Sequence, residues 1–132
     1  MDTSKDSKRH FNGKAVGIEF IKYFYSTWAS NPDAFWEQII KPHSKMQCND
    51  DTFEGIHFIA FLKNIASTGI MFNNCKSQVF DSGSRQIQIL INGMITIGTE
   101  QPKYFSHFMM IVYMGEKEAN KWTLTNSILS IN

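Results

Sequence analysis

The sequence predicts an α+β fold, with helices on one side of a curved, mostly antiparallel sheet. Two observations lead to this prediction. The C-terminal third contains long runs that alternate or are rich in β-branched and aromatic residues, separated by polar connections with Gly or Pro; these runs are 86–97, 104–113 and 121–131. The first half repeats its apolar residues at helical spacing, so it can cover the apolar face of those strands.

Three helices are expected before the long strands. The first would span residues 10–30, with an apolar face formed by Phe11, Ala15, Ile18, Ile21, Tyr25 and Trp28. Gly13 and Gly17 weaken its first turns by about 1 kcal/mol each relative to Ala. A second, short helix would run from Pro32 to about Ile40. Its inward residues would be Phe35, Trp36, Ile39 and Ile40.

The remaining elements are predicted from short apolar runs and the turns between them. A short hairpin over residues 43–54 precedes a third helix, which would start at Gly55 and end near Gly69. A strand over residues 70–81 follows. The sequence Asp81-Ser82-Gly83-Ser84 is the strongest hairpin signal in the chain and leads into the three long runs.

Length and composition indicate a single globular domain without a strongly charged surface. The chain has 132 residues, a net charge of +1, and 42% hydrophobic residues. We expect residues 1–9 to be disordered and residues 10–132 to form one domain. The low net charge argues against direct nucleic-acid or membrane binding through bulk charge, and no signal peptide or membrane span is evident. Cys48 and Cys75 are expected to be reduced, buried thiols of an intracellular protein; a disulfide or a metal site is the alternative.

No recognised catalytic, phosphate-binding or zinc motif occurs in the sequence. The histidines His43, His57 and His107 cannot be paired with a carboxylate from spacing alone, and a mid-strand His such as His107 is more often packed or exposed than a general base. We therefore expect a binding protein without catalytic residues, metal or cofactor. The rival interpretation is a small dehydratase-like or isomerase-like enzyme with a pocket under the helices.

The run from Tyr104 to Tyr113 has apolar residues on both alternating faces. One face can pack on the helices, and the other needs a partner, because large exposed apolar patches usually mark interfaces. The alternative is a strand buried between two layers of one domain. We expect pairing through a sheet face formed by Tyr104, Ser106, Phe108, Met110, Ile128 and Ser130.

Several stretches, in this order and spacing, resemble the nuclear transport factor 2 (NTF2-like) family. They are Phe20–Tyr25, Thr52–Leu62, Ile91–Ile95, Tyr104–Ile111 and Trp122–Asn126. The resemblance covers roughly Gly13 to Ile131. It implies a cone of three N-terminal helices on a curved antiparallel sheet, and a dimer formed through that sheet.

The resemblance also implies a set of functions. One member is a homodimer that carries Ran-GDP into the nucleus, and another is a small subunit that pairs with the NTF2-like domain of a large mRNA-export receptor. Further members are stress-granule scaffolds or small enzymes. The transport members imply binding to nucleoporin FG repeats and a location in nucleus, cytoplasm and nuclear pore.

Positions of the Ran carrier can be transferred one by one. A Trp-Glu pair falls on Cys48 and Asn49, and two acids fall on Gly98 and Glu100, of which Glu100 alone retains the charge. An N-terminal tryptophan linked to nucleoporin repeats falls near Gly13, and a dimer-interface arginine falls on Ser130. The resemblance therefore favours the mRNA-export small subunit, with the Ran-GDP carrier as the alternative.

Overall fold

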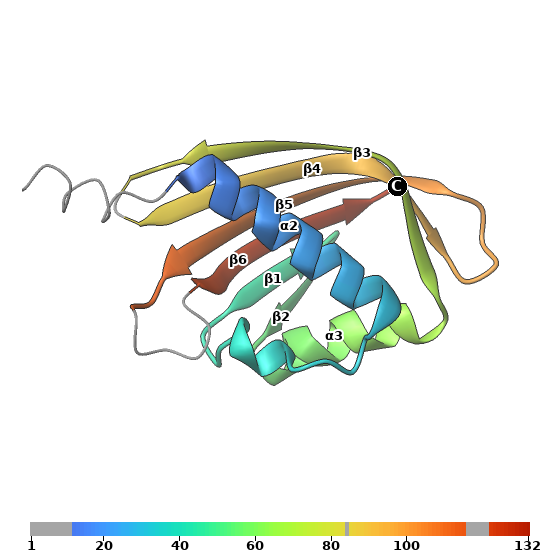
Figure 1. The fold of residues 1–132 in the computed structure, drawn as a ribbon. Coiled ribbons are helices and arrows are strands. Elements are labelled where there is room, and N and C mark those ends of the chain that lie inside the picture. The colour runs from blue at the N-terminus through green and yellow to red at the C-terminus, as the bar shows by residue number, and fades with distance from the viewer. Residues whose placement is uncertain (1–11, 84, 116–121) are drawn as a thin grey trace, which may run out of the picture.

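The computed structural model describes residues 12–83, 85–115 and 122–132, and these form an α+β fold (Figure 1). Our expectation for residues 1–9 lies outside this part of the chain. The elements are α2 (Gly13–Ser30), the 3₁₀ turn η1 (Trp36–Gln38), β1 (Lys45–Cys48), β2 (Asp51–Glu54), α3 (Ile56–Ser67), β3 (Ile70–Asp81), β4 (Gln86–Ile97), β5 (Lys103–Tyr113) and β6 (Trp122–Ile131). The predicted fold class is confirmed.

One six-stranded sheet has the order β2-β1-β6-β5-β4-β3. All neighbours are antiparallel except β1 and β6, which run parallel with Met46 opposite Ser127. The prediction of a mostly antiparallel sheet is therefore confirmed, with the pairing of β1 and β6 as the exception. Parallel neighbours require a long crossover, and here the crossover contains α3 and the strands β2 to β5.

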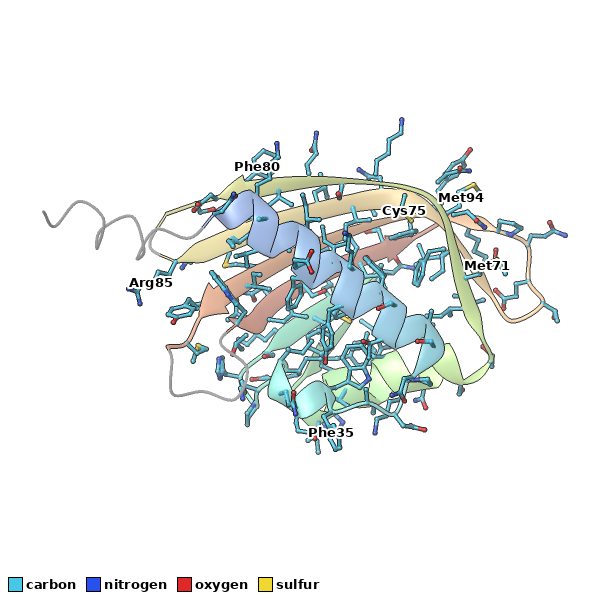
Figure 2. The ribbon with its side chains drawn as sticks, viewed as in Figure 1. Phe35, Met71, Cys75, Phe80, Arg85 and Met94 are labelled. Carbon is cyan, nitrogen blue, oxygen red and sulfur yellow. The ribbon has the colours of Figure 1, made fainter. Side chains whose placement is uncertain are left out.

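The second predicted helix is wrong, because η1 is a single 3₁₀ turn. The Ile39 carbonyl accepts a hydrogen bond from Leu124 N–H of β6 at 2.8 Å, so it is not available to a further helical turn. Pro42 further disfavours helical backbone at the residue before it. Trp36, Ile39 and Ile40 are buried as predicted, whereas Phe35 is 67% exposed (Figure 2).

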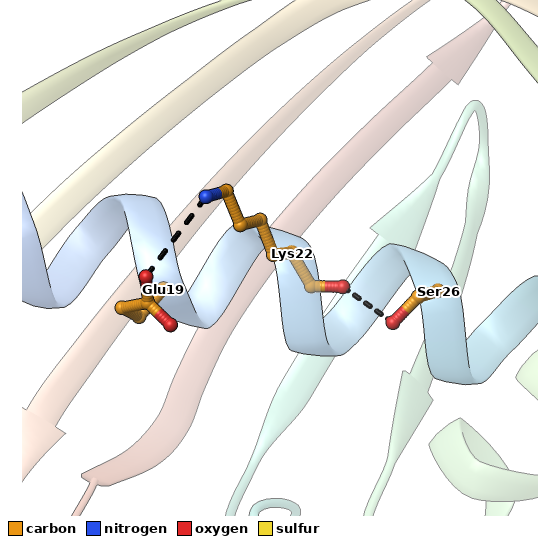
Figure 3. Close-up of polar contacts among 3 residues, drawn as sticks. All are labelled: Glu19, Lys22 and Ser26. Atoms are coloured by element: carbon orange, nitrogen blue, oxygen red, sulfur yellow. Dashed lines mark hydrogen bonds and ion pairs between the residues drawn. The ribbon is translucent and has the colours of Figure 1, made fainter.

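Helix α2 contacts the sheet through a face that only partly overlaps the predicted one. Trp28 is buried as predicted, and Ile21 and Tyr25 pack partly buried against the core, whereas Ile18 is exposed. The other buried residues of the helix are Gly13, Gly17, Phe20 and Phe24. A Cβ at Gly17 would lie 2.5 Å from Val79 Cγ1, and a Cβ at Gly13 would lie 2.5 Å from Asp81 Oδ2. The glycines, which lower helix propensity, therefore allow α2 to approach β3 closely. The opposite face of α2 carries exposed polar contacts, including the Glu19–Lys22 pair and the bond from Ser26 Oγ to Lys22 O (Figure 3).

The core lies between α2, α3 and the helix-side face of the sheet, called here the inner face. Phe24 is at its centre, with ring centroids 5.2 Å from Trp36 and 5.7 Å from Trp28. Alternate residues of the central strands point into this core, as the pleat requires, and they include Ile87, Ile89, Ile91, Phe105, His107, Met109, Ile111 and Leu129. Aromatic rings therefore fill the space under the helices.

A β-bulge bends the edge strand β3. Its pairing with β4 shifts between Asn73 and Lys76, so Asn74 and Cys75 together lie opposite Gly93. Asn74 has a left-handed backbone with φ +55°. A Cβ at Gly93 would lie 2.7 Å from Cys75 Sγ, so glycine is required where the bulge crosses its neighbour. Bulges of this kind increase strand twist and redirect side chains.

Candidate protein-binding face

The register places all six predicted partner residues on one side of the sheet, away from the helices; we call this side the outer face. Phe108 lies opposite Ile128, and Ser106 lies opposite Ser130. The remaining two, Tyr104 and Met110, alternate with the buried inner residues of β5. Strand β4 extends the face, with Leu90 opposite Phe108 and Met94 opposite Tyr104.

The outer face is apolar at its centre and open to solvent. Tyr104 is 69% exposed and Ile128 is 48% exposed, while Phe108 and Met110 are half-buried. Within the described residues, both α-helices lie over the inner face (Figure 1). The alternative of a strand buried between two layers of this domain therefore does not describe these residues.

Two shallow hollows give the outer face a shape that a partner can fill. One, of about 390 Å³, lies over β1, β6 and β5 and is lined by Phe108, Met110 and Ile128 together with Lys45. The other, of about 480 Å³, lies beside the bulge and is lined by amides of Asn74, Asn92 and Asn132 around Tyr104. The surface therefore has an apolar centre with polar groups around it, which is typical of protein interfaces.

The first pair of transferred Ran-carrier positions lies at the turn between β1 and β2. Asn49 has φ +52° and bonds to Ile131 with both ends of its amide, from Nδ2 to the Ile131 carbonyl at 3.3 Å and from Ile131 N–H to Oδ1 at 3.1 Å. Cys48 is half-buried beside it, opposite Leu129. The Asn49 side chain thus connects the β1–β2 turn to the end of β6 through two hydrogen bonds.

The second pair lies in the connection between β4 and β5, at the same end of the sheet. Gly98 has φ +60° and donates its N–H to the Gly69 carbonyl at 2.7 Å. Glu100 is exposed and forms an ion pair with Lys103 at 3.4 Å. The structure therefore brings both pairs to one end of the sheet, but the single retained acid already faces a lysine.

A hydrogen-bonded chain crosses the core through His107. Its Nδ1 lies 2.6 Å from the Tyr25 hydroxyl on α2, and its Nε2 lies 2.6 Å from Ser127 Oγ on β6. Burial lowers the pKa of His107 to about 3, so the imidazole is neutral at physiological pH. Burial, with a smaller contribution from Cys75, raises the pKa of Tyr25 well above its usual range. The sequence does not predict these hydrogen bonds, because Tyr25 and His107 are 82 positions apart.

The three candidate histidines lie in two kinds of environment within the described residues. The hydrogen-bond partners of His107 are hydroxyls, and His43 and His57 are exposed. The described residues contain no group of three or more His, Cys, Asp or Glu that could hold a metal ion, and no helix long and apolar enough to cross a membrane. Both cysteines are free thiols, but Cys75 is exposed on the bulge, so the expectation of a buried thiol is wrong there.

Comparison with known proteins identifies the fold and no closer relationship. No protein-family model and no curated protein matches the sequence. Among solved structures, nuclear transport factor 2 (Ntf2) from Cryptosporidium parvum is similar with a TM-score of 0.78 and 18% identity, covering 91% of this chain and 94% of that one. Yeast Bre5, a Ubp3-associated protein, has a TM-score of 0.68 at 11% identity, covering 93% of this chain and 98% of Bre5.

A third similar structure belongs to a protein for which an enzymatic activity has been suggested. It is a Streptomyces avermitilis protein of the NTF2-like family for which a dehydratase activity has been suggested, and it has a TM-score of 0.70 at 11% identity, covering 92% of this chain and 96% of that one. At these identities the likeness establishes an NTF2-like cone. The fold alone supports both binding proteins and enzymes, so the function has to be argued from the surface.

Proposed function

We propose that this chain is a protein-binding module of nucleocytoplasmic transport, and not an enzyme. In this proposal it pairs through the outer face with a second NTF2-like domain, in the manner of a small subunit of an mRNA-export receptor. The observation that carries the proposal is the row of solvent-exposed apolar residues on the side of the sheet opposite the helices. The proposed location is nucleus, cytoplasm and nuclear pore, with nucleoporin FG repeats as further partners.

The outer face has the composition of an interface. Tyr104, Phe108, Met110 and Ile128 are large and apolar, and aromatic residues and Met are enriched in interface cores. A stable pair would cover about 800 Å² on each partner. Such a cover would remove these side chains from water at about 25 cal/mol per Å² of apolar area, part of which offsets the entropy lost on association.

The export role is preferred to Ran carriage because the residues at the positions transferred from the Ran carrier lack its acids or already have partners within this chain. Asn49 stands where the carrier has an acid, and both ends of its amide are engaged with Ile131. Gly98 replaces a second acid, and Glu100 faces Lys103. Removing one partner of a buried charge pair costs about 2–5 kcal/mol, so these changes would weaken Ran-GDP binding by orders of magnitude.

A Ran carrier with a rebuilt site is the second candidate, and one observation favours it. Asp50 and Asp51 are exposed beside Asn49, at the same end of the sheet as Glu100. Calorimetry with Ran-GDP decides between the two roles. Micromolar binding that is lost in Glu100→Lys would replace the export role with the carrier role.

Sedimentation tests the pairing itself. The purified chain is examined alone and in a mixture with the NTF2-like domain of an mRNA-export receptor. We expect a homodimer in the first sample or a heterodimer in the second. Phe108→Glu places a charge at the centre of the outer face and should leave only monomers. Phe35→Glu is the control, because Phe35 is an exposed phenylalanine that caps the start of η1 and is not among the outer-face residues. Two outcomes would contradict the proposal. One is a wild-type chain that stays monomeric both alone and in the mixture, and the other is an equal degree of dimer formation in the two variants.

A further inference from the structure

The bulge in β3 opens a second surface feature on the helix side of the sheet. A groove of about 320 Å³ lies between α2 and β3, and we call it the bulge groove. Its apolar lining comes from Ile21, Tyr25, Phe72 and Ile91. This volume is at the lower end of the range of small-molecule sites, about 300–1,000 Å³. None of the six predicted outer-face residues lines it.

The lining is held in place by the core. The Tyr25 hydroxyl is fixed by His107, and the Tyr25 ring packs edge-on against Phe72 with centroids 4.7 Å apart. The bulge itself is fixed by Gly93, since only a residue without Cβ leaves room for Cys75. The groove is therefore preformed, and a ligand would lose little binding free energy in ordering it.

The charged groups that line the groove have one sign. Lys22 comes from α2 and Lys76 from the bulged strand, and no carboxylate is among the lining residues. Lys22 has only a loose contact with Glu19, at 4.0 Å between two exposed side chains, and this contact contributes little. The groove thus combines an apolar floor with two available cations.

We propose that the bulge groove binds a small amphipathic carboxylate, with its apolar chain on Tyr25, Phe72 and Ile91 and its carboxylate between Lys22 and Lys76. An uncharged chain of the same length would gain the apolar contacts but not the two charge-assisted contacts. A cation would be repelled by both lysines. The charge pattern therefore specifies the class of ligand, and the volume limits its length.

Cys75 provides a direct readout of the groove. Its thiol is exposed and belongs to the lining. Cys48 lies on β1, near the opposite edge of the sheet from β3. In a Cys48→Ser background, modification of Cys75 by a thiol reagent reports whether the groove is empty. Octanoate at about ten times its Kd should slow this modification roughly tenfold, because only the empty fraction reacts.

Three comparisons make the test specific. Octanol should protect Cys75 clearly less than octanoate does at equal concentration, and octylammonium should not protect it. Lys22→Gln and Lys76→Gln should each weaken octanoate binding about two- to fivefold, the range of a partly exposed charge contact. Lys14→Gln is the matched control, since Lys14 is exposed on α2 outside the groove and should leave binding unchanged.

Calorimetry with octanoate provides an independent measurement if Cys75 reacts slowly. Saturable binding that is weakened by the two groove lysine variants and not by Lys14→Gln supports the proposal. Absence of binding, equal protection by octanol, or loss of binding in all three lysine variants would overturn it. Protection by an acidic peptide but not by octanoate would also overturn it and assign the groove to a protein ligand. The Lys22→Gln outcome is independent of pairing, which Phe108→Glu tests on the other face. Lys76 also lines the outer-face hollow beside the bulge, so Lys76→Gln is measured in the Phe108→Glu background.

Discussion

The two faces of β5 carry side chains of similar chemistry in opposite environments. Met109 is fully buried under the helices, whereas its neighbour Met110 lies half-buried on the outer face. Phe105 is 3% exposed, and Tyr104 is 69% exposed. Burial on the inner face stabilises the fold. The outer face has an apolar centre that no helix covers, and this difference indicates that its apolar residues have a role beyond folding.

The largest expected difference between the faces concerns the two adjacent methionines. Met109→Ala leaves a cavity in a packed core and should lower the free energy of unfolding by about 2–5 kcal/mol. Met110→Ala removes a half-exposed side chain and should cost less than about 1 kcal/mol under conditions where the protein is monomeric. Urea unfolding of both variants measures this. Equal losses would show that the outer face is as important to the fold as the inner one.

The inner face should also respond to acid through His107. Its pKa is about 3 in the folded protein and 6.5 in the unfolded chain, so the unfolded state binds the proton first as the pH falls. Stability is therefore full above pH 6.5 and falls below it, by up to about 1.4 kcal/mol per pH unit, or about 2 kcal/mol at pH 5.

The measurement is urea unfolding between pH 7 and pH 5 for the wild type and for His107→Gln. The variant cannot titrate, so its pH dependence should be flatter than that of the wild type. His43→Gln is the control for replacing a histidine as such, because His43 is exposed. Parallel curves for the wild type and His107→Gln would show that folding does not lower the pKa of His107.

A smaller effect is expected where α2 covers the inner face. Gly17→Ala places a Cβ 2.5 Å from Val79 Cγ1 and should cost about 1–2 kcal/mol, since the clash exceeds the gain of about 1 kcal/mol in helix propensity. Val79→Ala in the same chain should restore part of the loss. A Gly17→Ala protein that is more stable than the wild type would show that α2 can move away from β3 without cost.

The sequence predicted the elements better than it predicted their contacts. Apolar runs, alternation and the turns between them located β3 to β6 within a residue or two, and the outer-face residues followed from the period of two along a strand. The apolar face of α2 was partly misplaced, because helical spacing counts Ile18 as apolar. The same spacing cannot identify Gly17 as a contact residue, since Gly17 contacts β3 because it has no Cβ. The second helix was wrong because Leu124, distant in sequence, donates its N–H to the Ile39 carbonyl that a longer helix would have used.

The features of the candidate sites that sequence reasoning missed all depend on tertiary placement. The link from Tyr25 to His107 to Ser127 joins three separate elements. The bulge groove requires Cys75 to cross Gly93, a contact between two strands that spacing along the sequence does not show. Asn49 could be identified as a departure from the Ran carrier, but its double contact with Ile131 needed coordinates.

The position of β6 has a consequence for how the chain is made. This last described strand lies inside the sheet, between β1 and β5, so it joins the early hairpin to the later strands. During synthesis both halves emerge from the ribosome before the strand that connects them, and contacts between such distant segments form slowly. A nascent chain that stalls before Trp122 would therefore expose two unpaired strand edges, one on β1 and one on β5, as sites for chaperone binding or aggregation.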